Sequence, residues 1–295
     1  MTGNNVRAFI RFAWISLAIT VVVIIWGAVV RATGSGAGCG SHWPLCNGVV
    51  VPLAPAASTV IEFVHRLTSG VAMILSLAVL VWAWRLFPAG HAARRWALAS
   101  LVFMLVEAGI GAGIVLLGLV EDNASALRAG YIAVHLTNTM LLMGAMTGTI
   151  HAGQRAEGKG QREGKGKREE GAGRTRWRTV ALLLMIVVAA AGAVVALGDT
   201  LFPHASLVEG IAADLDPTSH FLIRLRVWHP VLAIGAAILA VVAFRSSLVT
   251  TLVIVQMGLG VLNLAMLAPL PLQMAHLLGS NLLWVAMVWE RLRSN

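Results

Sequence analysis

The segment FAWISLAITVVVIIWGAVV, residues 12–30, contains no charged residue and decides the fold class of this chain. A helix needs about 20 apolar residues to cross the hydrocarbon core of a bilayer, and this run is long enough. Apolar residues make up 58% of the 295 residues and charged residues 12%, which excludes a disordered chain, a coiled coil and an ordinary soluble domain. Apolar segments lie at about 12–33, 58–86, 95–119, 129–151, 178–197, 220–244, 248–268 and 271–290. The sequence therefore predicts an all-α polytopic membrane protein with eight transmembrane helices.

The end of the first segment belongs to an internal repeat. GAVV at 27–30 recurs at 192–195, VEAGIG at 106–111 resembles VQMGLG at 255–260, and AVHL at 133–136 resembles MAHL at 274–277. The matches come in the same order, and four helices per repeat give both copies the same orientation. We expect two four-helix bundles related by a pseudo-twofold axis along the membrane normal. The expected domains are an N-terminal bundle (1–152), a flexible basic linker (153–177) and a C-terminal bundle (178–295).

The net charge of +9 is mainly a topology signal. Seventeen of the 22 Lys and Arg residues lie on one side if the helices alternate, and nine of these lie between residues 153 and 178. The positive-inside rule places that side in the cytoplasm, together with both termini. The charge therefore does not indicate nucleic-acid binding, and the lipid bilayer is the expected environment.

Five arginines break this rule, because each lies near the outer end of a helix. One explanation is snorkelling to the outer headgroups. Five together on the disfavoured side instead suggest that anionic groups are bound there. These residues are Arg31, Arg66, Arg128, Arg224 and Arg226.

Four histidines lie inside the apolar segments at a similar depth, on the order of 8–15 Å from the outer end. The repeat places them on equivalent helices, which favours ligands over isolated polar groups. Facing histidines from two helices of a bundle are typical axial ligands of haem. Di-iron and zinc sites are less favoured, because clustered carboxylate, His or Cys ligands are missing. We expect His65 to face His135 and His229 to face His276.

Two acidic residues accompany these histidines. Glu62 lies three residues before His65 and shares its helix face, so it could pair with an arginine or face a substrate. The second repeat has Arg226 at the equivalent position before His229, which favours one reactive and one supporting site. Glu107 is deeper, its counterpart is Gln256, and we interpret it mainly as a structural hydrogen-bonding residue.

Cys39 and Cys46 lie in the first outer loop. The predicted topology exposes them to an oxidising compartment, so we expect a disulfide. It could be a structural staple or a redox relay.

Together these motifs resemble the haem A synthase family. The resemblance rests on RATGSG at 31–36, the cysteine pair, Glu62-x-x-His65-Arg66, VHL at 134–136 and AHL at 275–277. It covers the eight helices and excludes the linker.

The resemblance implies a chemistry for each half. The family oxidises the C8 methyl group of haem O to a formyl group by successive hydroxylations and loss of water. By resemblance, substrate haem O lies between His65 and His135, haem b lies between His229 and His276, and Glu62 is catalytic. The arginines become candidates for binding haem propionates, and the cysteines match the family's outer-loop disulfide.

The resemblance also implies partners and a location. Haem O synthase supplies the substrate, cytochrome oxidase assembly uses the product, and an electron donor is needed. The expected location is the bacterial plasma membrane, with the haem and cysteine side outside the cell.

This sequence departs from the family at His229, which is followed by Pro230 where many relatives have arginine, and at Glu107, where glutamine is common. Two other functions stay open. A bis-histidine di-haem b electron-transfer protein would have two equivalent sites. A transporter is favoured by the repeat but disfavoured by four level histidines.

Overall fold

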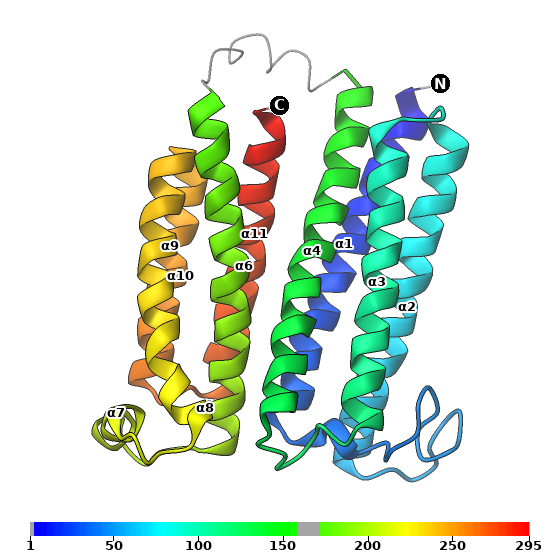
Figure 1. Cartoon of the computed structure of the whole chain (residues 1–295). Helices are drawn as coiled ribbons and strands as arrows, with labels where there is room; N and C mark the ends of the chain where they lie inside the picture. The colour runs from blue at the N-terminus through cyan, green and yellow to red at the C-terminus, as the bar shows by residue number, and fades with distance from the viewer. Residues whose placement is uncertain (1–2, 159–171, 295) are drawn as a thin grey trace.

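The computed structural model describes residues 3–158 and 172–294. The first half contains α1 (Gly3–Ala32), the short η1 (Ser35–Ala37), α2 (Ala57–Leu86), α3 (Ala92–Leu116) and α4 (Ala126–Ala156). The second half contains α6 (Ala172–Leu201), α7 (Leu207–Leu215), α8 (Phe221–Arg224), η2 (Leu225–Val227), α9 (Trp228–Phe244), α10 (Ser247–Ala265) and α11 (Leu270–Arg293). The eight long helices among the described residues form two groups of four (Figure 1). The all-α membrane fold is confirmed.

Seven of the described helices are long and apolar enough to cross a membrane. The eighth long helix, α4, spans 31 residues but is richer in polar side chains and buries more of its length. It packs against α3 and α1 in its own group and against α6 and α11 in the other. Because α4 faces protein on several sides, it needs less apolar surface than a lipid-facing helix.

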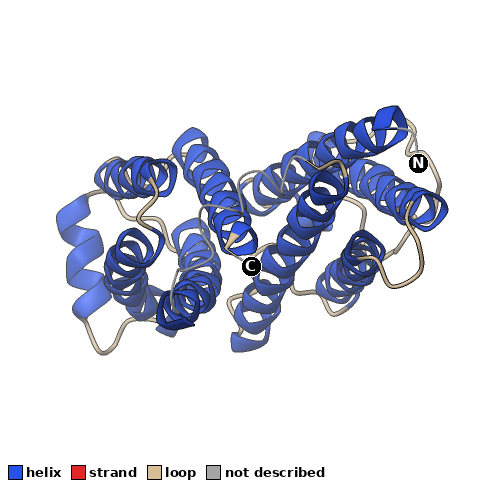
Figure 2. Cartoon of the chain, turned by 90° about the horizontal axis from the view of Figure 1, so that it is seen from above, coloured by secondary structure: helices blue, strands red, loops and turns tan. Residues whose placement is uncertain are grey.

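The two groups lie side by side, as the view along the helices shows (Figure 2). On α11, Trp284 donates its indole N–H to the backbone oxygen of Met140 on α4, at 2.8 Å. The Trp284 ring also lies against Gly144, one turn further along α4. These contacts join equivalent helices of the two repeats near their middle.

The sixth expected segment, 220–244, is not one continuous α-helix. It consists of α8, the 3₁₀ turn η2 and α9. Pro230 has no backbone N–H, and its ring clashes with the carbonyl group four residues earlier, that of Arg226. The break therefore falls just before His229, where the sequence departs from the family pattern.

The loops at the two ends of the bundle differ. The described ends of the chain, Gly3 and Ser294, lie at one end, and the disulfide loop and α7 lie at the other (Figure 1). α7 is an element that the apolar segments did not predict. Of the expected linker, residues 153–156 belong to α4 and 172–177 to α6, whereas 159–171 lie outside the described residues.

Candidate functional site

The four expected ligands lie near the same end of four helices, the end that carries the disulfide loop. His65 is on α2, His135 on α4, His229 on α9 and His276 on α11. Each of them lies within three turns of the start of its helix. All four therefore lie toward the same end of the bundle, and a common depth stays a prediction of the repeat.

Glycines on the first helix of each half make room for two of these histidines. A Cβ atom at Gly27 of α1 would lie 2.9 Å from Cε1 of His65. A Cβ at Gly192 of α6 would lie 2.8 Å from Cε1 of His229. These are the glycines of the repeated GAVV motif. In each copy of the motif, one imidazole ring lies against the glycine. We call Gly27 and Gly192 the seats of these histidines.

In the second half, the two histidines face each other. The ring centroids of His229 and His276 are 6.4 Å apart, and the ring planes are nearly perpendicular, at 81°. His229 Nδ1 lies 3.2 Å from the backbone oxygen of Val188 on α6. Donation to that carbonyl leaves Nε2 of His229 with a free lone pair. On the other side, Gln256 of α10 contacts both ring nitrogens of His276 at 3.2 Å.

In the first half, His65 on α2 and His135 on α4 have different surroundings. His65 Nδ1 is buried and has no hydrogen-bond partner among the described residues. His135 Nδ1 lies 3.0 Å from Oε1 of Glu107 on α3. Glu107 also accepts a hydrogen bond from Asn138 Nδ2 at 2.5 Å and one from the Thr139 hydroxyl.

The donor set of the second half has a spacing that fits a haem iron. Two imidazoles with metal–nitrogen bonds of about 2 Å place their centroids about 6 Å apart, close to the 6.4 Å separation of His229 and His276. Ligating histidines usually donate their other ring N–H to a carbonyl or carboxylate. His229 has such a partner in the Val188 carbonyl, whereas Nδ1 of His135 lies 3.0 Å from the Glu107 carboxylate without an aligned hydrogen bond. Among the described residues, no group of three or more His, Cys, Asp or Glu could hold a bare metal ion.

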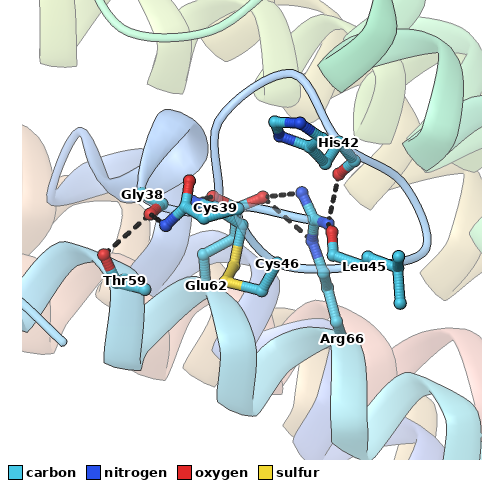
Figure 3. Close-up of a disulfide and its surroundings, with 9 residues drawn as sticks. Gly38, Cys39, His42, Leu45, Cys46, Thr59, Glu62 and Arg66 are labelled. Atoms are coloured by element: carbon cyan, nitrogen blue, oxygen red, sulfur yellow. Dashed lines mark hydrogen bonds and ion pairs between the residues drawn. A yellow bond between two sulfur atoms is a disulfide. The ribbon is translucent and has the colours of Figure 1, made fainter. Parts of the chain in front are cut away.

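Glu62 is buried beside the disulfide loop (Figure 3). It lies three residues before His65 on α2. Its Oε2 accepts a hydrogen bond from the backbone N–H of Cys39 at 2.8 Å. Its Oε1 pairs with the guanidinium group of Arg66, whose Nε is 3.0 Å away. The pairing with an arginine, one of the two expected alternatives, is therefore present.

Arg66 links Glu62 to the loop that the disulfide closes. Its Nη1 donates to the backbone oxygens of His42 and Leu45, both at 2.6 Å (Figure 3). Cys39 and Cys46 are bonded to each other, which confirms the expected disulfide. The disulfide loop, Arg66 and Glu62 thus form one continuous network.

Arg31 joins the two halves rather than remaining within the first. Its Nη1 donates to the Ala196 backbone oxygen and to the Thr200 hydroxyl, both on α6 and both at 2.5 Å. Its Nη2 donates to Gln273 Oε1 on α11 at 2.9 Å. Arg31 therefore lies at the boundary between the two groups of helices.

Arg226 is surrounded by acids and carbonyl groups of the second half. Its Nε is 3.1 Å from Asp199 Oδ1, and its Nη1 is 3.8 Å from Asp214 Oδ1 of α7. It also donates to the backbone oxygens of Gly198 and Phe202. Burial raises the pKa of Asp214 above its ordinary value, and the charge of Arg226 opposes this effect.

The other two arginines contact backbone oxygens. Arg128 donates to those of Glu121 and Asn123, at 2.5 and 2.9 Å. Arg224 donates to that of Pro217 at 3.1 Å. All five arginines near the outer helix ends thus have partners within the protein. That any of them binds a haem propionate stays a prediction.

Sequence reasoning missed two features of the site. One is the direct contact of Glu107 with His135, which its pairing with Gln256 in the repeat could have indicated. The other is the ion pair between Arg226 and Asp199, whose separation along the chain leaves no local pattern.

Comparisons with known proteins show the family of this chain. A family model described as cytochrome oxidase assembly protein (COX15-CtaA) matches residues 10–288. A Thermus thermophilus protein named protoheme IX farnesyltransferase is 41% identical over 293 residues, which is 94% of this chain and 47% of that protein. The heme A synthase of Shouchella clausii is 40% identical over 122 residues, 41% of this chain and 40% of that protein. The heme A synthase of Geobacillus kaustophilus is 39% identical over 132 residues, 44% of this chain and 41% of that protein.

The chain thus spans about half the length, or less, of these curated relatives. The family model, by contrast, covers nearly the whole chain, including all four histidines, Glu62 and both cysteines. The resemblance to haem A synthases is therefore confirmed at the level of the family. The chain belongs to the cytochrome oxidase assembly protein family that includes these enzymes.

Proposed function

We propose that this chain converts haem O to haem A by oxidising the C8 methyl group to a formyl group. Two hydroxylations each replace a C–H bond by C–OH and remove two electrons from the carbon, and the resulting diol loses one water. The oxygen source and the redox partner are separate components. The observation that carries the proposal is the asymmetry between the repeats, Glu62 in one and Arg226 in the other, within a family that includes haem A synthases.

The first half is the proposed substrate site. His65 and His135 hold the iron of haem O, and Glu62 lies one turn from His65 on the same helix. Glu62 is the proposed catalytic residue, because a carboxylate at this place can stabilise positive charge or take up a proton. Its bonds to Cys39 and Arg66 keep it at the outer end of the site.

The second half is the proposed cofactor site. His229 and His276 hold haem b, which supplies one-electron transfer when bound. Arg226 occupies the place of Glu62 and is paired with Asp199, so the second half has a cation where the first half has a carboxylate. The outer arginines are proposed to bind propionates by exchanging some of their backbone contacts for carboxylates.

The proposed source of the substrate is a farnesyltransferase. The Thermus relative is named for that activity, and this chain matches 47% of its length. Such a relative suggests that farnesylation and oxidation are linked steps, so haem O would pass to this chain from a haem O synthase. The product would serve the assembly of cytochrome oxidase.

The proposed location is the bacterial plasma membrane, with both termini in the cytoplasm. The positive-inside pattern supports this orientation. The disulfide lies at the end opposite the described chain ends, which suits an oxidising outer compartment.

The test is identification of the haems extracted from the purified protein, produced in cells that supply haem O. We expect haem b together with haem O or haem A. Two b-type haems without haem O or haem A would favour the di-haem electron-transfer protein instead. Substrate uptake by protein without bound haem would favour a transporter.

Glu62→Ala tests the catalytic assignment. The variant should keep its haems but form haem A about 10²–10⁴-fold more slowly, the usual contribution of an acid–base residue. Asp122→Asn is the matched control, because Asp122 is an exposed acid at the same end of the bundle. Haem A formation at the normal rate in Glu62→Ala would refute the catalytic role.

A further inference from the structure

Glu107 and Gln256 occupy equivalent positions in the two repeats, and each contacts the equivalent histidine of the following helix. Glu107 Oε1 lies 3.0 Å from Nδ1 of His135. Gln256 Nε2 lies 3.2 Å from ring nitrogens of His276 and 3.1 Å from its backbone oxygen. The geometry is repeated, but the chemical group is not.

The two groups place different charges beside their histidines. Glu107 has a carboxylate without a donor, and its negative charge beside Nδ1 of His135 favours a proton on that nitrogen and a lone pair on Nε2, although the contact is an ion-pair contact and not an aligned hydrogen bond. Gln256 has a neutral amide, whose nitrogen lies 3.2 Å from both ring nitrogens of His276 and does not select one of them. The first half therefore favours a tautomer suited to binding a metal, with negative charge behind it.

The residues around Glu107 and Gln256 also differ between the two halves. Asn138 and Thr139, on the turn after His135, both donate to Glu107. In the register of the repeat, their places are taken by Gly279 and Ser280. A Cβ atom at Gly279 would collide with Oε1 of Gln256. The first half is thus built around a carboxylate and the second around an amide.

We propose that Glu107 is a positioning residue that makes His135 a stronger electron donor to a bound haem iron than His276. This inference rests on the proposed function only in that these histidines bind haem. An acceptor carboxylate on the far nitrogen raises the basicity of a ligating histidine. Hydrogen bonding to the axial ligand and nearby charge are levers on haem potential. The first-half haem should therefore have the lower reduction potential, because its ferric state is stabilised.

The test is a spectroelectrochemical titration of purified protein loaded with ferric protohaem, which requires no turnover. Glu107→Gln gives the first half the group of the second and should raise the midpoint potential of one haem. Gln256→Glu is the reciprocal change and should lower the potential of the other haem. His65→Ala and His229→Ala backgrounds assign each midpoint to its half.

A purely structural role for Glu107 predicts a different result. Thr139→Val removes the hydroxyl that bonds Glu107 and the backbone oxygen of His135, but leaves the Glu107 carboxylate beside the His135 ring. It should lower the thermal unfolding temperature and leave both midpoints in place. Equal midpoints in Glu107→Gln and the unsubstituted protein would overturn the proposal, as would an equal shift in Thr139→Val. If Gln256→Glu fails to fold, the Glu107→Gln titration decides alone.

The outcomes also separate this proposal from the proposed function. Suppose that Glu107→Gln shifts the midpoint potential but the unsubstituted protein forms no haem A. This result supports the positioning role and refutes the oxidation. Normal haem A formation with an unshifted midpoint refutes the positioning role alone. A first half that binds no protohaem refutes His135 as a ligand and this inference with it.

Discussion

One turn before the histidine of α2, the first half has Glu62, bonded to the backbone of the disulfide loop. At the same place before the histidine of α9, the second half has Arg226, paired with Asp199. The supporting helices differ likewise, with Glu107 against one histidine and Gln256 against the other. Both halves keep the seats of the histidines, Gly27 and Gly192.

This difference shows which parts of a duplicated site can diverge. The seats are constrained by backbone sterics, because any side chain there would push into an imidazole ring. The charged neighbours are free to change without altering the helix packing. Divergence of charge over a shared scaffold is what the proposed function requires, with a reaction in one half and electron transfer in the other.

The largest stability effect should come from breaking the charge pairing particular to the second half. Arg226→Ala leaves Asp199 without its guanidinium partner, and losing one member of a buried pair costs about 3–5 kcal/mol. We expect the lower end of this range, because the side chain of Asp199 is 25% exposed. Thermal unfolding in detergent measures the loss.

Arg224→Ala is the matched control for Arg226→Ala. Arg224 is exposed and donates one bond, to Pro217, so its loss should stay within about 0.5 kcal/mol. Equal losses in the two variants would mean that the Asp199 pair contributes nothing particular to the second half.

A smaller loss of stability should follow substitution of the glycines that lie against the histidines, and it should be similar in both halves. Gly27→Ala and Gly192→Ala each place a methyl group under 3.0 Å from a histidine ring. Overpacking of this kind costs about 1–3 kcal/mol, and haem binding in the same half should weaken. Haem content per half and thermal unfolding measure the two effects.

Gly70→Ala on α2 is the control for the seats, because a Cβ there meets nothing within 4 Å. Replacing a helical glycine where there is room should stabilise the protein by about 0.4–1 kcal/mol. If Gly27→Ala behaved like Gly70→Ala, the seat would not constrain His65.

The smallest effect should arise where the halves meet. Trp284→Phe removes the hydrogen bond from α11 to the Met140 carbonyl of α4, worth about 0.5–1.5 kcal/mol. Trp177→Phe, at an exposed position of α6, should be nearly neutral. If Trp177→Phe lost as much stability as Trp284→Phe, the result would argue against a specific contact between the halves.

Much of this molecule was predictable from its sequence. Helix positions follow from apolar runs, and the placement of His65, His135, His229 and His276 toward one end of the bundle follows from the repeat, because both are properties of spacing. The disulfide follows from two cysteines in one outer loop.

Other features depend on which helices meet, and spacing along the chain does not contain that information. Arg31 of the first half donates hydrogen bonds to Thr200 and Gln273 of the second half. The ion pair of Arg226 with Asp199 joins η2 to α6. The break before α9 was foreseeable from Pro230 but was hidden in an apolar run. α7 was not predicted, because its nine residues are too few to form an apolar segment that spans a membrane.

The most direct test of two halves with different tasks is the identity of the haem that each half holds. His65→Ala and His229→Ala are purified from cells that supply haem O, and the extracted haems are separated by chromatography. The account predicts that His65→Ala keeps haem b and lacks haem O and haem A, whereas His229→Ala lacks haem b and keeps haem O. Loss of the same haem from both variants, or haem b alone in both, would contradict it.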